Sequence, residues 1–406
     1  MTNSKLVPKR RFKEFESDGE WEKRKLTDFI ELFSGLTYSP NDVRKSGTLV
    51  LRSSNIKNGE IVDADNVFVT PAKATSENVK LGDIIVVVRN GSRSLIGKHA
   101  RVKCEKPNTV IGAFMTGMHT EHSLFVNALL DTPKFGEEIE KNMGATINQI
   151  TGTMFSEMEF IIPDELEQDI IGNFFQTIDS LISIHQHKLD KLKNLKKAYL
   201  SEMFPAEGER VPKRRFPGFE GDWEQKNLGE LTLYRNGTGY EEKQSDTGKY
   251  ELVNLNSIAI DGGLKPSGRF IDEDAETLVK NDLVMVLSDV ANGDLLGRVA
   301  IIPEDNRFVL NQRVALLRNN GSVDIKYLFY YINAHQKYFK LQGAGSSQLN
   351  ISKNSVESFE VLLSSISEQQ CIGNFFKKLD QSISLQQQKL DKLNDLKKAY
   401  LNELFV

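Results

Sequence analysis

The chain has little of what secreted and membrane proteins need. It contains two cysteines among 406 residues, Cys104 and Cys371, and no uninterrupted apolar run long enough to span a membrane. Two cysteines at unrelated positions cannot form a disulfide framework, and no signal-peptide pattern is present, so we expect a cytoplasmic protein. The formal net charge of −4 gives no general attraction to nucleic acid. Any such contact must depend on local charge, because salt screens charges over about 8–10 Å.

Motifs that hold cofactors or metals are also missing from the sequence. There is no GxGxxG after a predicted strand, no GxxxxGK[ST], no HExxH, no CxxC and no glycine loop for S-adenosylmethionine. His119 and His122 are close in sequence, but two imidazoles without an evident third ligand rarely make a zinc site. The sequence therefore predicts a chain with no catalytic centre, no bound cofactor and no metal.

One segment of the chain occurs twice. Residues 171–204 and 372–405 align without a gap, and about two-thirds of the aligned positions are identical. The two copies lie about 200 residues apart, far beyond the period of a solenoid or propeller, which indicates duplication of one large unit. A duplicated unit suits a partner or ligand that offers two similar sites.

The duplication extends beyond this segment. Residues 7–12 recur as residues 211–216, both reading VPKRRF, and the only two tryptophans, Trp21 and Trp223, occupy equivalent places after these segments. Between these anchors and the repeated segments the copies agree only faintly. The basic VPKRRF segments suit either phosphate binding or an ordinary solvated surface. Pseudo-symmetry predicts that residues 1–20 lie beside the end of the C-terminal repeated segment, as residues 205–220 follow the first.

Each repeated segment has the pattern of a long helix. Taking Ile171 as position a, apolar residues recur at a, d and e, a stripe wider than a strict coiled-coil seam. Each helix of about 40 residues would be about 60 Å long. Because one such helix cannot bury its stripe alone, we expect the two copies to pair, and pseudo-two-fold symmetry makes the pair antiparallel.

The faintly related parts carry strand signals. The runs at 84–88 and 283–287 are predicted buried strands flanked by turn residues, and short helices are predicted near 123–141 and 325–341. The predicted fold is α+β, with two pseudo-symmetric β-rich globular domains separated by a pair of long antiparallel helices. The predicted division is residues 1–162, linker and first globule; 163–204, first helix; 205–364, linker and second globule; and 365–406, second helix.

Layout and residues together resemble the specificity subunits of type I restriction–modification enzymes. The resemblance covers essentially the whole chain. It is carried by the helix segments at 188–197 and 389–398, the Gly-Asn-Phe-Phe that precedes each, and the loops at 144–150 and 345–351. It implies two target-recognition domains that each read half of a bipartite double-stranded DNA sequence, with the helices as a ruler. It further implies two modification subunits that use S-adenosylmethionine and, through them, restriction subunits that use ATP and Mg²⁺.

Polar loop residues of the types that bind base edges and phosphates are candidates for the DNA contact. In the first globule the candidates are Arg52, Ser53, Asn55, Arg89, Asn90, Ser92, Arg93, Lys98, Thr146, Asn148 and Gln149. In the second they are Asn254, Asn256, Ser288, Asn292, Arg298, Gln312, Arg313, Ser346, Ser347, Gln348 and Asn350. On the helices, Lys196, Lys197, Lys397 and Lys398 are candidates for the modification-subunit contact.

Two other classes of protein remain open at this point. A coiled-coil scaffold without a DNA role would share the helices, and a gel shift with genomic fragments would separate it from a DNA reader. A self-sufficient methyltransferase or nuclease is disfavoured by the missing motifs, and labelled S-adenosylmethionine with the purified chain would test it.

Overall fold

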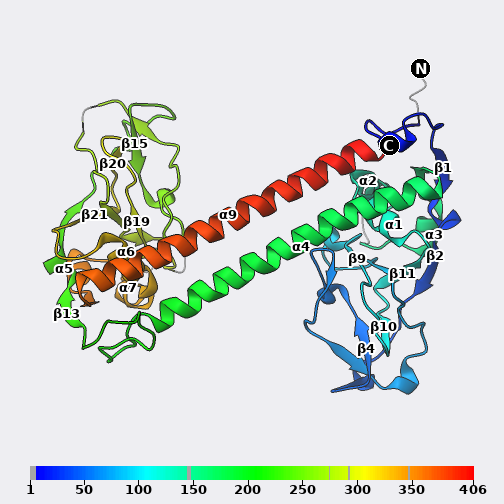
Figure 1. Cartoon of the computed structure of the whole chain (residues 1–406), viewed down its shortest axis with the longest axis horizontal. Helices are drawn as coiled ribbons and strands as arrows, with labels where there is room; N and C mark the ends of the chain where they lie inside the picture. The colour runs from blue at the N-terminus through cyan, green and yellow to red at the C-terminus, as the bar shows by residue number, and fades with distance from the viewer. Residues whose placement is uncertain (1–5, 144–147, 274, 291–292, 346–347) are drawn as a thin grey trace. The chain divides into compact units, whose positions relative to one another are not determined.

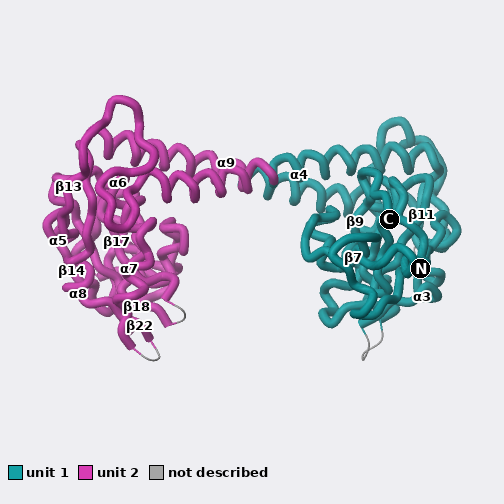
Figure 2. Tube along the Cα trace, turned by 90° about the horizontal axis from the view of Figure 1, so that it is seen from below, with its two compact units in different colours: residues 1–186, 388–406 teal, residues 187–387 magenta. Residues whose placement is uncertain are grey.

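The structure is a computed structural model that describes residues 6–143, 148–273, 275–290, 293–345 and 348–406. The chain divides into two compact units (Figure 2). Unit 1 comprises residues 1–186 and 388–406, and unit 2 comprises residues 187–387. The division falls inside both long helices, so each unit contains the start of one long helix and the end of the other.

The two units share most of their helices and strands in the same order, although in the described residues β3, β5 and β6 occur only in unit 1 and α5, β18 and β22 only in unit 2 (Figure 1). Up to the first long helix they are β1 (Glu22–Lys25), β2 (Glu31–Ser34), β3 (Val43–Arg44), β4 (Thr48–Leu51), β5 (Ile56–Lys57), β6 (Glu60–Ile61), β7 (Val67–Val69), β8 (Ile84–Val87), β9 (His99–Arg101), β10 (Thr109–Ile111), β11 (Met115–His119), α1 (Ser123–Leu130), α2 (Pro133–Asn142), α3 (Gly152–Glu157), β12 (Glu159–Ile162) and α4 (Glu165–Glu202). The second series is β13 (Glu224–Asn227), α5 (Leu228–Leu231), β14 (Thr232–Asn236), β15 (Tyr250–Val253), β16 (Phe270–Ile271), β17 (Leu283–Val286), β18 (Ser288–Asp289), β19 (Val299–Ile301), β20 (Phe308–Leu310), β21 (Val314–Asn319), α6 (Ile325–Ala334), α7 (Gln336–Gln342), β22 (Leu349–Asn350), α8 (Lys353–Glu357), β23 (Glu360–Leu363) and α9 (Ile366–Leu404).

The two units share the topology of their central sheet, while the second sheet has four described strands in unit 1 and three in unit 2. The central sheet is antiparallel, with order β2-β11-β8-β9 in unit 1 and β14-β21-β17-β19 in unit 2. A second sheet contains one parallel pair, β4 with β10 or β15 with β20. The predicted strands at 84–88 and 283–287 are confirmed as β8 and β17, whose residues are fully buried. The α+β class is thereby confirmed.

Each long helix begins with the same capping arrangement. The Asp164 carboxylate accepts a hydrogen bond from the backbone N–H of Glu167 at 3.0 Å, and Ser365 Oγ accepts one from Glu368 at 3.4 Å. Such caps satisfy backbone donors that have no partner inside the helix. The side chains of Glu167 and Glu368, each at the third position of its helix, are almost completely buried.

The buried glutamates hold the VPKRRF segments. Arg11 donates through Nε and Nη2 to Glu167 at 2.9 and 2.6 Å, and Arg215 donates to Glu368 at 2.7 and 2.8 Å. A buried carboxylate is tolerated only when paired in this way, and the two-pronged contact is one that arginine makes and lysine cannot. The second arginine of each segment therefore belongs to the fold rather than to a free basic surface.

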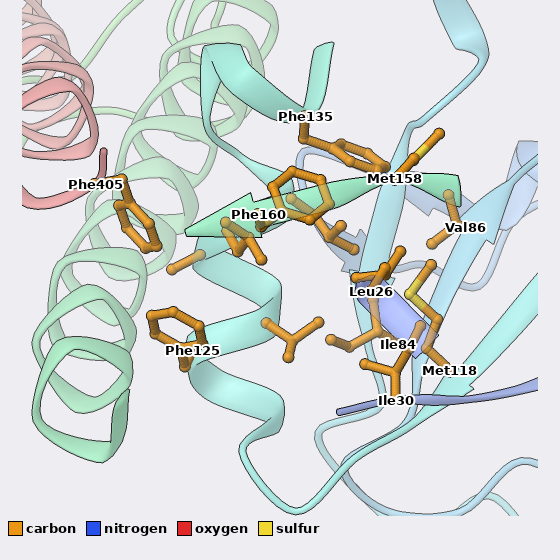
Figure 3. Close-up of a cluster of buried hydrophobic side chains, with 14 of the residues drawn as sticks. Leu26, Ile30, Ile84, Val86, Met118, Phe125, Phe135, Met158, Phe160 and Phe405 are labelled. Carbon is orange, nitrogen blue, oxygen red and sulfur yellow. The ribbon is translucent and has the colours of Figure 1, made fainter. Parts of the chain in front are cut away.

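The end of each long helix completes the core of the unit that contains it. In unit 1, Phe405 follows α9 and stacks on Phe125 of α1 at 5.5 Å between ring centroids (Figure 3). In unit 2, Phe204 follows α4 and contacts Tyr327 of α6 at 5.6 Å. In unit 1, Phe174 contacts Tyr400 and Asp179 pairs with Lys397, so the two helix stretches run antiparallel. Unit 2 repeats this with Tyr199 against Phe375 and Lys196 against Asp380.

Residues 6–20 lie on the end of α9, as the pseudo-symmetry predicts. The Arg10 backbone N–H donates to the Glu403 carbonyl at 2.9 Å, and the Arg10 side chain pairs with the Glu403 carboxylate at 2.7 Å. Unit 2 repeats the contact between Arg214 and Glu202, with distances of 2.8 and 2.6 Å. The linker of each unit is thus attached to the helix end that enters that unit.

Candidate nucleic-acid interface

In unit 1, polar residues are held at the edge where β8 leaves the central sheet. Arg89 pairs with Gln149 in an antiparallel bridge, the backbone N–H of Ile150 donates to Val88 at 2.8 Å, and that of Asn90 donates to Asn148 at 3.4 Å. The described part of the 144–150 loop is therefore fixed by backbone hydrogen bonds to the residues that directly follow the buried strand β8. Its side chains start from a rigid base, which a specific contact requires.

The same arrangement recurs in unit 2. β18 pairs with β22, so that Ser288 lies opposite Asn350, and the backbone N–H of Ile351 donates to Leu287 at 2.9 Å. When the two units are compared by these pairings, Gln149 corresponds to Asn350 and Arg89 corresponds to Ser288. The two units thus have different side chains at equivalent positions, Arg89 and Gln149 against the buried Ser288 and the exposed Asn350.

A third segment reaches this edge in each unit. In unit 1 it is the turn 112–114 between β10 and β11, where the Phe114 carbonyl accepts hydrogen bonds from Val88 and Arg89 at 3.0 and 3.2 Å. In unit 2 it is the turn 311–313 between β20 and β21, where the Arg313 carbonyl accepts from Leu287 at 2.9 Å. The sequence prediction included Gln312 and Arg313 and missed Phe114, because only polar residue types were considered.

Glycine fixes the position of both turns. A Cβ atom at Gly35 would lie 2.0 Å from the Gly112 carbonyl oxygen, and one at Gly237 would lie 1.8 Å from that of Asn311. No other residue could follow β2 or β14 at this distance from the turn. Because the two approaches are equivalent, the turns occupy the same place in both units.

Residues 52 and 53 belong to the same edge in unit 1. Asn90 Nδ2 donates to Ser53 Oγ at 3.2 Å, and Lys98 Nζ donates to the Ser53 carbonyl at 3.4 Å. Arg52 is partly engaged, because it pairs with Asp65 at 3.0 Å. The structure therefore brings together most of the described candidates of the first unit.

Three of the predicted DNA-binding side chains form hydrogen bonds inside the fold. Asn55 is completely buried, and its amide accepts from the Arg52 backbone N–H at 2.9 Å and donates to the Ala64 carbonyl at 2.7 Å. Arg298 is half-buried and donates to the Asn333 carbonyl at 3.1 Å, and burial lowers its pKa. Ser288 is 4% exposed and hydrogen-bonded to Asn350. The hydrogen-bonding groups of these three side chains are used within the fold.

The remaining candidates differ in their surroundings. Arg93 is exposed but paired with Glu140. Gln312 donates to Glu241, and Asn254 accepts from the Asn256 backbone N–H at 2.9 Å. Ser92 and Asn256 are exposed, and Gln348 is half-buried. The predictions for Thr146, Asn292, Ser346 and Ser347 concern positions outside the described residues.

The helix lysines fall into two kinds. Lys397 is mostly buried and pairs with Asp131 and Asp179, each at 2.6 Å, and Lys196 pairs with Asp380 at 2.6 Å. Burial raises the pKa of Asp179, while the two carboxylates keep that of Lys397 raised despite burial. Lys197 and Lys398 are exposed. Of the four lysines predicted to contact a partner, these two have the geometry for it.

The histidine pair is used for internal contacts. His119 lies 2.6 Å from the buried Asp83, and His122 lies 2.8 Å from Asp169. Across the described ranges, no group of three or more His, Cys, Asp or Glu side chains is placed to hold a metal ion. None of the helices in those ranges combines the length and hydropathy that a membrane crossing requires.

A sequence model of one family matches most of the chain in two copies. Its description is "Type I restriction modification DNA specificity domain", and it matches residues 18–194 and 220–395. Among curated proteins, the chain is 23% identical over 380 residues to the StySPI type I restriction enzyme specificity subunit of Salmonella potsdam, covering 86% of this chain and 80% of that protein. It is 24% identical over 256 residues to the EcoKI specificity subunit of Escherichia coli strain K12, covering 59% and 54%.

Solved structures share the fold. The S subunit of a type I restriction–modification system from M. genitalium aligns with a TM-score of 0.66 at 17% identity and covers 99% of both chains. A chain from a study of complex assembly and conformational transition of the type I R-M system aligns with a TM-score of 0.51 at 14% identity and covers 95% of this chain and 97% of its own. The predicted fold of two repeated domains with long helices is confirmed by this likeness.

Proposed function

This chain belongs to the type I restriction modification DNA specificity family, and from that premise we propose that it selects the DNA target of a multi-subunit methyltransferase and endonuclease. Unit 1 would read one half of a bipartite double-stranded sequence, and unit 2 would read the other. The chain itself would carry out no chemistry.

One observation carries the proposal. The two units keep the same turn and equivalent backbone hydrogen bonds at one edge, but unit 1 places Arg89 and Gln149 where unit 2 has the buried Ser288 and the exposed Asn350. Arginine, glutamine and asparagine are the side chains that form paired hydrogen bonds with base edges in the major groove. Constant framework with variable base-reading chemistry is what two half-site readers need.

The proposed division of labour follows the chain. Residues 1–162 and 205–364 would supply the linkers and the two target-recognition domains. Residues 163–204 and 365–406 would supply the helices that set the length of unread DNA between the half-sites. The helices α4 and α9 lie within these ranges.

Two modification subunits would bind the two equivalent helix surfaces, and restriction subunits would join through them. S-adenosylmethionine, ATP and Mg²⁺ would be held by those partners rather than by this chain. Lys197 and Lys398 support such a contact, because they are exposed at equivalent positions of the repeat. The complex would work in the cytoplasm, where the two free cysteines stay reduced.

The test uses the full chain with and without its modification subunits. Labelled S-adenosylmethionine and genomic DNA should give methyl transfer only when both proteins are present, and the methylated sites should share two half-sites with a fixed gap. Methyl transfer by the rigorously purified chain alone would contradict the division of labour. Methylation that needs no particular sequence would contradict the assignment as a specificity subunit.

A further inference from the structure

The equivalent turns carry different exposed side chains at the same position. Phe114 and Arg313 each close the turn before a central strand, and each carbonyl accepts a hydrogen bond from the residue after the buried strand β8 or β17. Each turn is approached by a glycine, Gly35 or Gly237, so closely that a Cβ atom there would clash with the turn backbone. A side chain at this position therefore projects from a fixed point of the reading edge.

In unit 1 the residue at this turn position is the apolar Phe114, and a cationic side chain lies over its ring. The Phe114 ring is 55% exposed, although a side chain of this size is usually buried. The Arg89 guanidinium carbon lies 5.0 Å from the ring centroid, and Arg89 in turn pairs with Gln149. The exposed ring thus lies among the polar candidates for base contact rather than at an unrelated surface.

In unit 2 the cation occupies the turn itself. Arg313 is exposed, and its side chain forms no ion pair with any residue that the structure describes. The position of Arg89 is taken by the small, buried Ser288. The arginine at this edge is therefore located after the strand β8 in unit 1 and in the turn before β21 in unit 2.

The backbone of Arg313 is also unusual. Its φ is +66°, in the left-handed region. Every other non-glycine residue with positive φ in the described part of the chain is Asn or Asp, which tolerate this region well. An exposed arginine is kept here at a local conformational cost, and such strained positions concentrate at functional sites.

We propose that Phe114 and Arg313 are specificity-determining residues of the two half-sites. Phe114 contacts the C5-methyl group of a thymine, the one apolar feature that base edges offer in the major groove. Arg313 donates two hydrogen bonds to O6 and N7 of a guanine, which is the commonest specific arginine contact. This inference rests on the proposed function and adds the base class that each unit reads at the turn.

For unit 1 the test removes the methyl group and the ring separately. The assembled complex of this chain with its modification subunits is titrated with target DNA in which single thymines of the unit 1 half-site are replaced by deoxyuridine. One replacement should weaken binding of the unaltered complex about fourfold, as expected for one buried methyl group. The same replacement should not weaken the Phe114→Ala complex further. Phe114→Leu, which keeps an apolar side chain, should retain part of the thymine preference.

For unit 2 the corresponding probe is 7-deazaguanine, which lacks the N7 acceptor. Arg313→Ala should lower discrimination for one guanine by roughly tenfold or more and leave the unit 1 half-site unchanged. Arg313→Gly provides the second variant, because glycine favours positive φ. It should fold at least as stably as the unaltered chain while losing the same discrimination.

Matched controls lie at the opposite ends of β8 and β17, away from the turns. Leu81→Ala removes an exposed apolar side chain before β8, and Lys280→Ala removes an exposed cation before β17. Neither should alter the preferred sequence. If the unaltered complex shows two half-sites but Phe114→Ala and Arg313→Gly change no base preference, this inference is wrong and the proposed function stands. If both half-sites relax together in either variant, the inference is also wrong. If the unaltered complex has no bipartite target, the proposed function itself fails.

Discussion

Replacing Phe405 by alanine should destabilise unit 1 and leave unit 2 unchanged. Phe405 comes from the far end of the second repeat, yet only 8% of it is exposed, and its ring stacks on Phe125 at 5.5 Å and lies 5.8 Å from Phe175. Truncation of a buried phenylalanine to alanine costs about 3–5 kcal/mol. We expect about 3 kcal/mol, because the chain end can relax into part of the space.

Hydrogen exchange measured by mass spectrometry locates the loss. Amides of α1 and of the first turns of α4 should exchange up to about a hundredfold faster, since each 1.4 kcal/mol is a factor of about ten. Amides of α6 should keep their protection. The matched variant Phe204→Ala should give the reverse pattern, because Phe204 contacts Tyr327 of α6. Val406→Ala, at a position that is 37% exposed, is the control and should change little.

A loss below about 1 kcal/mol in Phe405→Ala, or an equal loss of protection in α1 and α6, would refute this reasoning. The first result would mean that the end of α9 does not complete the core of unit 1. The second would mean that the two units do not unfold separately.

Three other predictions concern charged groups. Lys398→Glu should weaken binding to the modification subunit in a pull-down without lowering the melting temperature, whereas Lys397→Glu should lower the melting temperature because it places a third carboxylate beside Asp131 and Asp179. Burial raises the pKa of Asp179 in the folded protein. The stability of the unaltered protein relative to Asp179→Asn should therefore be largest below about pH 4, the ordinary range of the group, and should fall as the pH rises through the folded pKa. Melting curves of both proteins between pH 4 and 7 test this, and a relative stability that rises with pH would contradict it. Glu368→Gln should cost about 3 kcal/mol in denaturant unfolding, because it leaves the mostly buried Arg215 without its carboxylate; a loss no larger than that of the exposed control Glu224→Gln would contradict a structural role for this pair.

Much of the fold could be predicted because its signals are periodic or repeated. The duplicated 34-residue segments predicted two long helices, and the structure has them at Glu165–Glu202 and Ile366–Leu404. The buried strands β8 and β17 were evident from continuous apolar runs between turn residues. The correspondence between residues 148–150 and 349–351 also followed from aligning the two copies, and both segments pair with the residues that follow a buried strand.

The candidate site could be predicted less well, because residue type does not reveal where a polar group is used. Asn55 reads as an exposed turn residue, but its amide closes its own loop in the interior. Lys397 reads as a solvated helix residue, but it lies between two carboxylates. Phe114 reads as a core residue, and only its turn geometry places it at the edge. Each of these positions depends on contacts between segments far apart in the sequence.

Exchange of one unit, followed by a map of the methylated motif, shows whether the two units read separate half-sites. Residues 20–160 are replaced by the corresponding segment of another family member, and adenine methylation is mapped across the genome of a host that carries the modification subunits. We expect that one half of the motif changes, while the other half keeps its sequence and the gap keeps its length. A motif that changes in both halves, or in neither, would contradict the reading of two half-sites by two separate units.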